Sequence, residues 1–125
     1  RSIAAGLPIQ QFGDGSSARD YTYIDDIVEG IVAAMDRLSG YHVWNLGGSR
    51  TVTLAGLIER ISKRLEREAR IEVKPMQPGD VDRTWADTTR SRNELQWEPR
   101  TGIEEGLDRF VAWFRSHHSG SENRT

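Results

Sequence analysis

The sequence contains no cysteine among its 125 residues. This absence excludes disulfide bonds, thiolate metal ligands and a thiol nucleophile. The sequence also lacks any apolar run near the roughly 18 residues that a transmembrane helix needs. The start, Arg1–Gly6, has no apolar core of the kind that signal peptides carry. We therefore expect a cytoplasmic protein with no membrane contact.

The sequence also lacks a large excess of either charge, because the formal net charge is only −2. Such a balance produces no overall basic field, so we expect no nucleic-acid partner. The dinucleotide-binding pattern Gly-x-Gly-x-x-Gly is missing as well. Gly13 and Gly15 lie in a predicted loop, and Gly47–Gly48 lacks a third glycine. The sequence therefore predicts no cofactor-binding residue.

What is present is the composition of an ordinary globular domain, with 36% apolar and 29% charged residues. A chain of this length forms about one domain with a modest core. We expect a domain over residues 1–115 and a disordered polar tail over residues 116–125. The chain opens without a methionine, so we expect it to begin partway through a helix or loop of something longer.

Two pairs of residues could suggest metal or acid/base chemistry. Asp80 and Asp82 flank a loop with no third ligand in view, and His117–His118 sits in the polar tail. Solvated side chains are the better interpretation of both, and no metal site is predicted.

Apolar residues at helical spacing predict three long amphipathic helices with short strands between them. Thr53 is the expected N-cap of the second helix, and Thr101 with Glu104 forms a capping box for the third. The expected elements are a helix over 24–38, a buried strand over 41–46, a helix reaching about Arg67, a strand over 71–75, a loop over 77–80, an extended piece over 84–86, a short helix capped by Asp87 or Thr88 and ending near Leu95, and a helix with Ile103, Leu107, Phe110, Val111 and Phe114 inward. The fold class is therefore α/β, a small mixed layer of helices and short strands.

Arg19 stands between a glycine-containing loop and the helix that begins at Ile24. A guanidinium fork can grip two phosphate oxygens there, and the amides of a helix N-terminus add to the attraction. From physics alone, a surface salt bridge with Asp20 or Asp25 is the more common arrangement. The residues alone do not decide between phosphate binding and a salt bridge.

The turn Gln77–Asp80 offers an amide and a carboxylate on a stiff backbone. The Asp80 carboxylate can accept hydrogen bonds from the adjacent hydroxyls of a ribose. A turn aspartate that satisfies its own backbone is about equally common.

The run Arg19-Asp20-Tyr21-Thr22-Tyr23-Ile24-Asp25-Asp26 and the turn Met76-Gln77-Pro78-Gly79-Asp80 together resemble the NAD-dependent nucleotide-sugar epimerases and dehydratases, the extended short-chain dehydrogenase/reductase family. The stretch from Ala86-Asp87 to Trp97-Glu98-Pro99 is similar to that family's closing pattern, with Gln96 in place of the usual glycine. Met-Gln-Pro-Gly-Asp looks like the version common among UDP-glucuronate 4-epimerases. The resemblance implies the C-terminal, substrate-binding part of the fold, with the Rossmann NAD domain absent.

The resemblance also implies roles for named residues. Arg19 would contact the diphosphate of a UDP-sugar, and Asp80 would lie near the ribose. Gln77 stands where many members have a second phosphate-binding arginine. The segment that includes Gln10, Gln11 and Phe12 would lie beside the base, although a lone phenylalanine more often anchors a loop to the core.

The family's catalytic Tyr-x-x-x-Lys is missing, since Glu59 and Arg70 precede Lys63 and Lys74 at that spacing. NAD and the catalytic base would thus belong to a missing N-terminal Rossmann domain, and this chain alone should bind no NAD and catalyse nothing. The function implied is that of a UDP-glucuronate or UDP-glucose 4-epimerase. A 4,6-dehydratase, a decarboxylase and a non-catalytic binding module are the alternatives. Separation from the Rossmann domain would leave an apolar face exposed, so we also expect the chain to self-associate.

Overall fold

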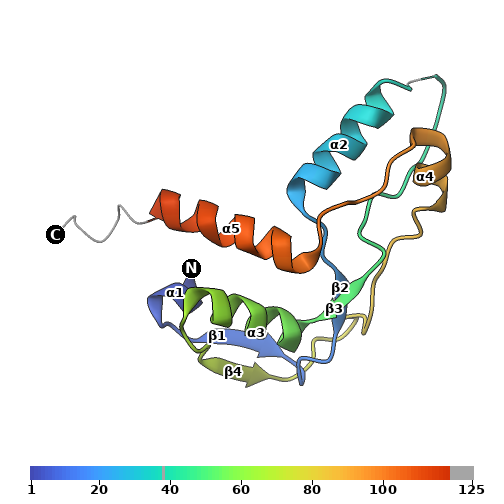
Figure 1. Cartoon of the computed structure of the whole chain (residues 1–125). Helices are drawn as coiled ribbons and strands as arrows, with labels where there is room; N and C mark the ends of the chain where they lie inside the picture. Colours follow the sequence, from blue (N-terminus) through green and yellow to red (C-terminus); the bar gives the residue numbers. More distant parts are fainter. Residues whose placement is uncertain (38, 119–125) are drawn as a thin grey trace.

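The computed structural model describes residues 1–37 and 39–118. Its helices and short strands form the mixed α/β arrangement that the sequence predicts (Figure 1). In chain order the elements are α1 (Ser2–Ala5), β1 (Ile9–Phe12), β2 (Ala18–Asp20), α2 (Ile24–Met35), β3 (Thr51–Thr53), α3 (Leu54–Leu65), β4 (Ile71–Lys74), α4 (Thr89–Leu95) and α5 (Ile103–His118). Figure 1 shows α1, α3, β1 and β4 in one group and α2 with α4 in another, with β2 and β3 between them.

A parallel pair of strands, β1 and β4, underlies α3 (Figure 1). Ile9 is opposite Ile71, and Phe12 is opposite Lys74. The strand predicted over 71–75 is confirmed as β4, which ends before Pro75 because proline has no N–H to donate to a ladder. β1 contains the candidate residues Gln10, Gln11 and Phe12.

The second pair, β2 with β3, is antiparallel and was not predicted. Arg19 is opposite Val52 in its register, and Ala18 also forms an isolated parallel bridge with Arg83 on the other side. Both strands are short and β2 is partly charged, so neither has the apolar alternation that identifies a strand in a sequence. Their pairing nevertheless decides where Arg19 lies.

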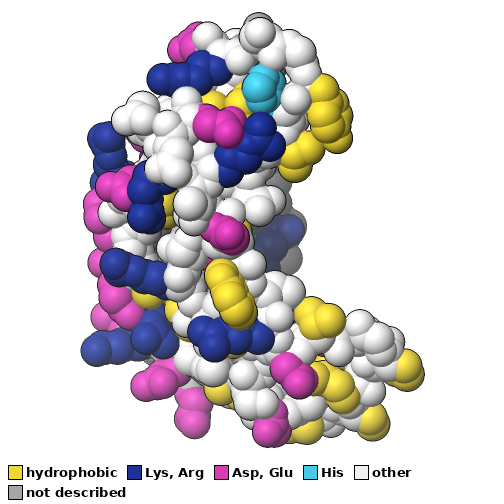
Figure 2. All heavy atoms as spheres, turned by 90° about the vertical axis from the view of Figure 1, so that its right-hand side faces the viewer, with side chains coloured by type: hydrophobic (Ala, Val, Ile, Leu, Met, Phe, Trp, Pro, Cys, Tyr) yellow, Lys and Arg dark blue, Asp and Glu magenta, His cyan; other side chains and the backbone are white. Residues whose placement is uncertain are grey.

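The helix predicted over 24–38 is α2, which ends at Met35, while position 38 lies outside the described residues. Its apolar stripe is largely uncovered by the described chain: Ile24 is 61% and Met35 62% exposed, and Val28, Ile31 and Val32 are also exposed. Figure 2 shows hydrophobic side chains gathered along one edge of the face it draws, opposite an edge rich in Lys, Arg, Asp and Glu. An apolar helix face of this kind normally packs against another element.

The buried strand predicted over 41–46 is wrong. These residues belong to no strand, and Tyr41 is 90% exposed. The segment is held instead by side chains, with Trp44 Nε1 donating to Glu94 at 2.7 Å and Arg90 Nη1 donating to the Val43 carbonyl at 3.1 Å. A strand needs a neighbour to pair with, and the described chain provides none at this position.

The predicted N-cap of α3 is confirmed, since Thr53 Oγ1 accepts a hydrogen bond from Gly56 N at 3.1 Å. The helix ends at Leu65, slightly before the expected Arg67, where Glu66 adopts a left-handed conformation with φ 53°. The short helix expected before Leu95 is α4, which follows Thr88.

The capping box predicted for α5 is wrong. Thr101 Oγ1 donates to Asp26 rather than accepting from the helix, and Glu104 accepts from Arg60 and Arg64 of α3. Both side chains have stronger partners elsewhere in the fold, because a charged group in the pair makes the hydrogen bond stronger than a neutral cap. The predicted inward face is right for Leu107 and Val111, which are buried, but Phe110 is 49% exposed.

α5 continues to His118, so the start of the segment predicted to be disordered is helical, and residues 119–125 lie outside the described residues. The core is small and comes from α1, α3, α5 and the chain around α4. Its buried hydrophobic residues are Ile3, Ile58, Leu95, Trp97, Leu107 and Val111. Among the described residues, no helix has the length and apolarity that spanning a membrane requires.

Candidate functional site

Two turns leave the carboxyl ends of the parallel strands β1 and β4 at the same edge of the pair. Gly13 begins the first turn and donates from its N–H to the Lys74 carbonyl at 2.9 Å. Gly13 has φ 73° and Gly15 has φ 84°, values that favour glycine. A side chain at Gly13 would meet the sulfur of Met76, so the two turns touch. In open α/β sheets, ligands bind at this end of parallel strands.

Arg19 and Asp80 are paired at this edge. Arg19 Nη2 donates to Asp80 Oδ1 at 2.7 Å, and the two side chains are 29% and 37% exposed. Arg19 Nη1 also donates to the Ala18 carbonyl at 3.0 Å, while Asp80 Oδ1 accepts from Val81 N at 3.0 Å. The structure therefore brings together the two residues in which the sequence placed phosphate and ribose recognition, although they come from separate motifs.

The expected surroundings of Arg19 differ in two respects. Arg19 lies on β2 and not in the loop directly before α2. The alternative salt bridge with Asp20 or Asp25 is wrong, because Asp20 accepts backbone N–H groups and Asp25 lies 3.8 Å from Arg109. The turn at Gln77 is confirmed, with Asp80 N donating to the Gln77 carbonyl at 3.2 Å.

The three candidate residues of β1 divide between the two faces of the strand. Gln11 is 5% exposed, and its Nε2 donates to the Gly13 carbonyl at 3.2 Å. Its side chain packs against the turn at Gly15, so Gln11 supports the loop from inside. Gln10 is exposed and Phe12 is half-buried. Gln10, Phe12 and the exposed Gln77 stay predictions as contacts to a base or phosphate.

Asp20 is a structural residue that sequence reasoning missed. Its carboxylate accepts three backbone N–H groups, from Gly48 at 2.8 Å, Ser49 at 3.0 Å and Ala86 at 3.1 Å. The group ties the Gly47–Gly48 loop and the 84–86 segment to β2. No local sequence signal marks these acceptors, because the donors are distant in the chain.

Asp26 has the same role at the other end of the Arg19–Asp26 run. It is 4% exposed and accepts from Arg100 N at 3.2 Å, Thr101 N at 3.0 Å and Thr101 Oγ1 at 3.2 Å. Its own carbonyl accepts from Trp97 Nε1 at 2.8 Å. Buried carboxylates are stable only when hydrogen-bonded in this way, so Asp26 fixes the connection between α4 and α5 onto α2.

Two glycine-containing loops are the candidates for a dinucleotide phosphate cradle. The Gly47–Gly48 loop follows no strand, and the N–H groups of Gly48 and Ser49 already donate to Asp20. Gly13 and Gly15 lie in a turn between two strands and do not open a helix. Neither loop fits a dinucleotide phosphate cradle, and we assign no residue of this chain to NAD.

Comparison with known proteins identifies the family. The family model described as GDP-mannose 4,6 dehydratase matches residues 1–110, and the chain belongs to this family. The chain is 41% identical over 111 residues to the UDP-glucuronate 4-epimerase of Thermodesulfobacterium geofontis, a match that covers 88% of this chain and 34% of that protein. The predicted resemblance to nucleotide-sugar epimerases and dehydratases is confirmed.

Solved structures support the same assignment. The chain is similar to the UDP-glucose 4-epimerase of Thermotoga maritima with UDP-glucose, with a TM-score of 0.84, 33% identity, and coverage of 93% of this chain and 37% of that one. It is also similar to the UDP-glucuronic acid 4-epimerase of Bacillus cereus in complex with UDP-glucuronic acid and NAD, with a TM-score of 0.82, 28% identity, and coverage of 94% and 38%. The chain spans about a third of the length of the curated relatives it matches first.

Proposed function

We propose that this chain is the substrate-binding portion of an NAD-dependent nucleotide-sugar 4-epimerase that acts on UDP-glucuronate or UDP-glucose. The single observation that supports this most is the Arg19–Asp80 pair, 2.7 Å apart, beside the touching turns that follow β1 and β4. Arg19 binds the diphosphate, because its planar fork matches two phosphate oxygens. Asp80 accepts from the ribose hydroxyls, and Gln10 and Phe12 lie toward the base.

The Arg19–Asp80 pair is suited to a ligand that carries both phosphate and hydroxyl groups. Both side chains remain partly exposed, so a ligand can approach them without unfolding the turns. An exposed ion pair contributes little to stability, which means that separating it for a ligand costs little. The buried Gln11 and the turn it supports keep the surrounding backbone fixed. Preorganised groups of this kind bind at a lower entropic cost.

A dehydratase or a decarboxylase is the second candidate. The family model that matches carries the description of a 4,6-dehydratase, and one relative, at 35% identity, is a UDP-glucuronic acid decarboxylase of Arabidopsis thaliana. All three reactions start from a nucleotide-sugar, so the proposed binding roles are the same. The products formed by the whole enzyme distinguish them, since only the decarboxylase releases carbon dioxide, only the dehydratase eliminates water, and the epimerase forms an isomer of its substrate.

We propose in addition that a Rossmann domain of the parent enzyme, which holds NAD and the catalytic base, packs against α2. The exposed apolar stripe of α2 and the unpaired 41–46 segment supply the surface. An isolated chain would leave this surface in water and associate with itself through it. This chain alone binds UDP-sugar and catalyses no reaction.

The test is titration of the chain with UDP-glucuronate and UDP-glucose by calorimetry, with NAD in parallel. Arg19→Ala should weaken UDP-sugar binding by about tenfold to a hundredfold, the range expected for lost charge-assisted hydrogen bonds. Arg37→Ala, at an exposed position after α2, is the matched control and should bind as the wild type does. Unchanged affinity in the Arg19 variant would rule out the role assigned to this residue.

A further inference from the structure

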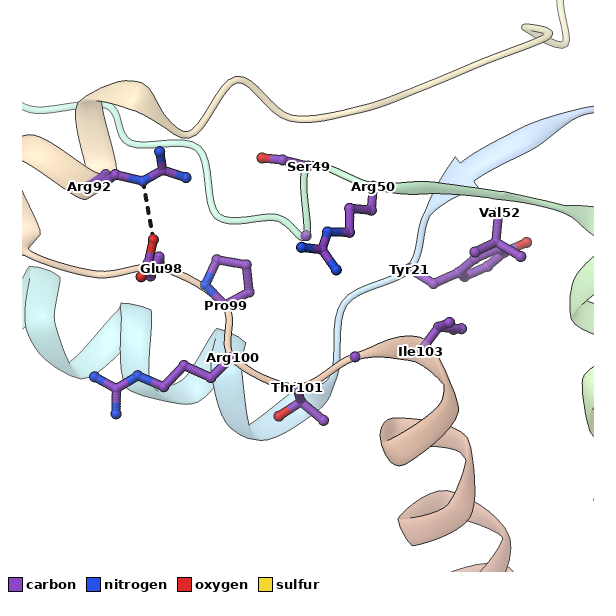
Figure 3. Close-up of a pocket in the computed structure, with 12 residues that line it drawn as sticks. Tyr21, Ser49, Arg50, Val52, Arg92, Glu98, Pro99, Arg100, Thr101 and Ile103 are labelled. Atoms are coloured by element: carbon purple, nitrogen blue, oxygen red, sulfur yellow. Dashed lines mark ion pairs between the residues drawn. The ribbon is translucent and has the colours of Figure 1, made fainter.

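A cavity lies apart from the Arg19–Asp80 pair. Its volume is about 400 Å3, within the range of small-molecule sites. It is bounded by the start of β3, the connection between α4 and α5, and the backbone that follows β2 (Figure 3). None of Arg19, Gln77 or Asp80 lines it.

The walls of this cavity are held by two of the three aspartates of the Arg19–Asp26 run. Asp20 fixes Gly48 and Ser49 on one side, and Asp26 fixes Arg100 and Thr101 on the other. Because these wall segments are each anchored by carboxylate hydrogen bonds, the cavity has a defined shape before any ligand enters it. It is a preorganised site and not a gap between loose loops.

The charge that faces this cavity is mainly positive. Figure 3 shows the Arg50 side chain extending from the start of β3 into the space between Pro99 and Tyr21. Within residues 1–37 and 39–118, the Arg50 guanidinium has no hydrogen bond or ion pair. Arg92 also lines the cavity and is paired with Glu98 at 3.3 Å, with the two side chains 60% and 59% exposed.

The pair of Arg92 and Glu98 is weak, because two exposed charges at this separation are screened by water. A stronger anion could therefore displace the Glu98 carboxylate from Arg92. The first turn of α5, at Ile103, also faces the cavity, and its N–H groups add a partial positive charge. The Arg100 side chain points away from this space in Figure 3 and contributes only at longer range.

We propose that this cavity binds a small phosphate-bearing anion through Arg50 and Arg92, at a site separate from the proposed UDP-sugar site. Planar guanidinium groups recognise phosphate oxygens in pairs, and the space is too small for a polynucleotide or a folded partner. The phosphate can come from free inorganic phosphate or from the phosphate group of a nucleotide. This inference does not depend on the function proposed for Arg19.

The test uses inorganic pyrophosphate and the full chain in the Arg19→Ala background, so that the proposed substrate site does not contribute. Calorimetry should find pyrophosphate binding retained in this background. Adding Arg50→Gln should weaken it by about tenfold or more, the effect expected for a lost charge-assisted contact. Adding Glu98→Gln should strengthen it, because Arg92 then loses its competing carboxylate. Arg37→Gln is the matched control and should have no effect.

Backbone amide shifts measured by NMR give the position of the ligand. Gly102 and Ile103 should shift on addition of pyrophosphate, and the spectrum of each variant reports whether it is folded. UMP in place of pyrophosphate distinguishes a nucleotide source from free phosphate. No pyrophosphate binding in the Arg19→Ala background, equal affinity with Arg50→Gln, or weaker binding with Glu98→Gln would each overturn the proposal. Failure of the unmodified chain to bind UDP-glucuronate would refute the proposed function and leave this site intact.

Discussion

Arg19 and Asp80, 61 positions apart in the chain, donate and accept one hydrogen bond of 2.7 Å. β2 delivers the arginine, and the turn after β4 delivers the aspartate. The cation proposed to bind phosphate and the anion proposed to bind hydroxyl groups therefore lie side by side at the carboxyl end of the parallel strands.

Replacing Asp80 should separate the two proposed roles of this pair. In Asp80→Asn the Arg19 guanidinium loses its carboxylate partner, so binding of inorganic pyrophosphate at Arg19 should be retained or strengthened. UDP binding should fall by about tenfold, because the ribose loses a charged acceptor. Calorimetry with both ligands in the Arg50→Gln background, which removes the proposed second pyrophosphate site, measures the difference. Asp82→Asn is the matched control, and equal losses in the two variants would contradict the ribose role.

Removing the Asp26 carboxylate should destabilise the fold. Asp26→Ala leaves the N–H groups of Arg100 and Thr101 without their acceptor, at a cost of about 3 kcal/mol in the free energy of unfolding. Urea denaturation followed by tryptophan fluorescence measures it. The exposed neighbour provides the control: Asp25→Ala should change stability by less than about 0.5 kcal/mol. Similar values for both would show that the Asp26 contacts carry little stability.

Glu104 should make stability sensitive to acid. Hydrogen bonds from Arg64 and then Arg60 hold the pKa of its carboxyl below the ordinary value. Because the folded-state pKa lies below the unfolded one, the stabilisation is fully present above the unfolded pKa and is lost as pH falls through the folded pKa. Glu104→Gln should therefore flatten the acid limb of a plot of stability against pH. Glu105→Gln, which alters a pair within α5, should leave that limb steep.

Placing a charge on the apolar stripe of α2 should abolish self-association. Val28 is 49% exposed in the middle of this stripe, and the unmodified chain should associate at high concentration through it. Val28→Glu should sediment as a monomer at the same concentration, while Glu29→Gln should behave as the wild type does. A wild-type chain that stays monomeric throughout would refute the self-association prediction.

The parts of the fold that were predictable are those whose cause is local. α3 follows from the Thr53 cap and an apolar stripe that a few adjacent turns define. β2 and β3 escaped prediction because each is stabilised by pairing with a distant segment and not by its own composition. The 41–46 segment has strand propensity, yet propensity produces no ladder without a neighbouring strand.

In the candidate site, too, some features follow from local sequence and others depend on distant segments. The motifs around Arg19 and Asp80 predicted that both contact one ligand. The structure shows the two side chains paired, and their contact with a ligand stays a prediction. Gln11 could not be identified as buried, because the side of β1 it occupies depends on packing against the turn at Gly15. The acceptor roles of Asp20 and Asp26 depend on backbone N–H groups from other parts of the chain, which no local pattern reveals.

The run from Arg19 to Asp26 contains residues of two kinds. Asp20 and Asp26 hold the backbone of three distant segments, whereas Arg19 points to the edge where a ligand can reach it. A screen that scores only loss of binding would rank substitutions at all three positions alike. Measuring both the amount of folded protein and the ligand affinity of each variant separates a destabilised fold from a lost ligand contact. Sensitivity to substitution alone therefore does not show where a ligand, or a drug designed against this motif, would contact the protein.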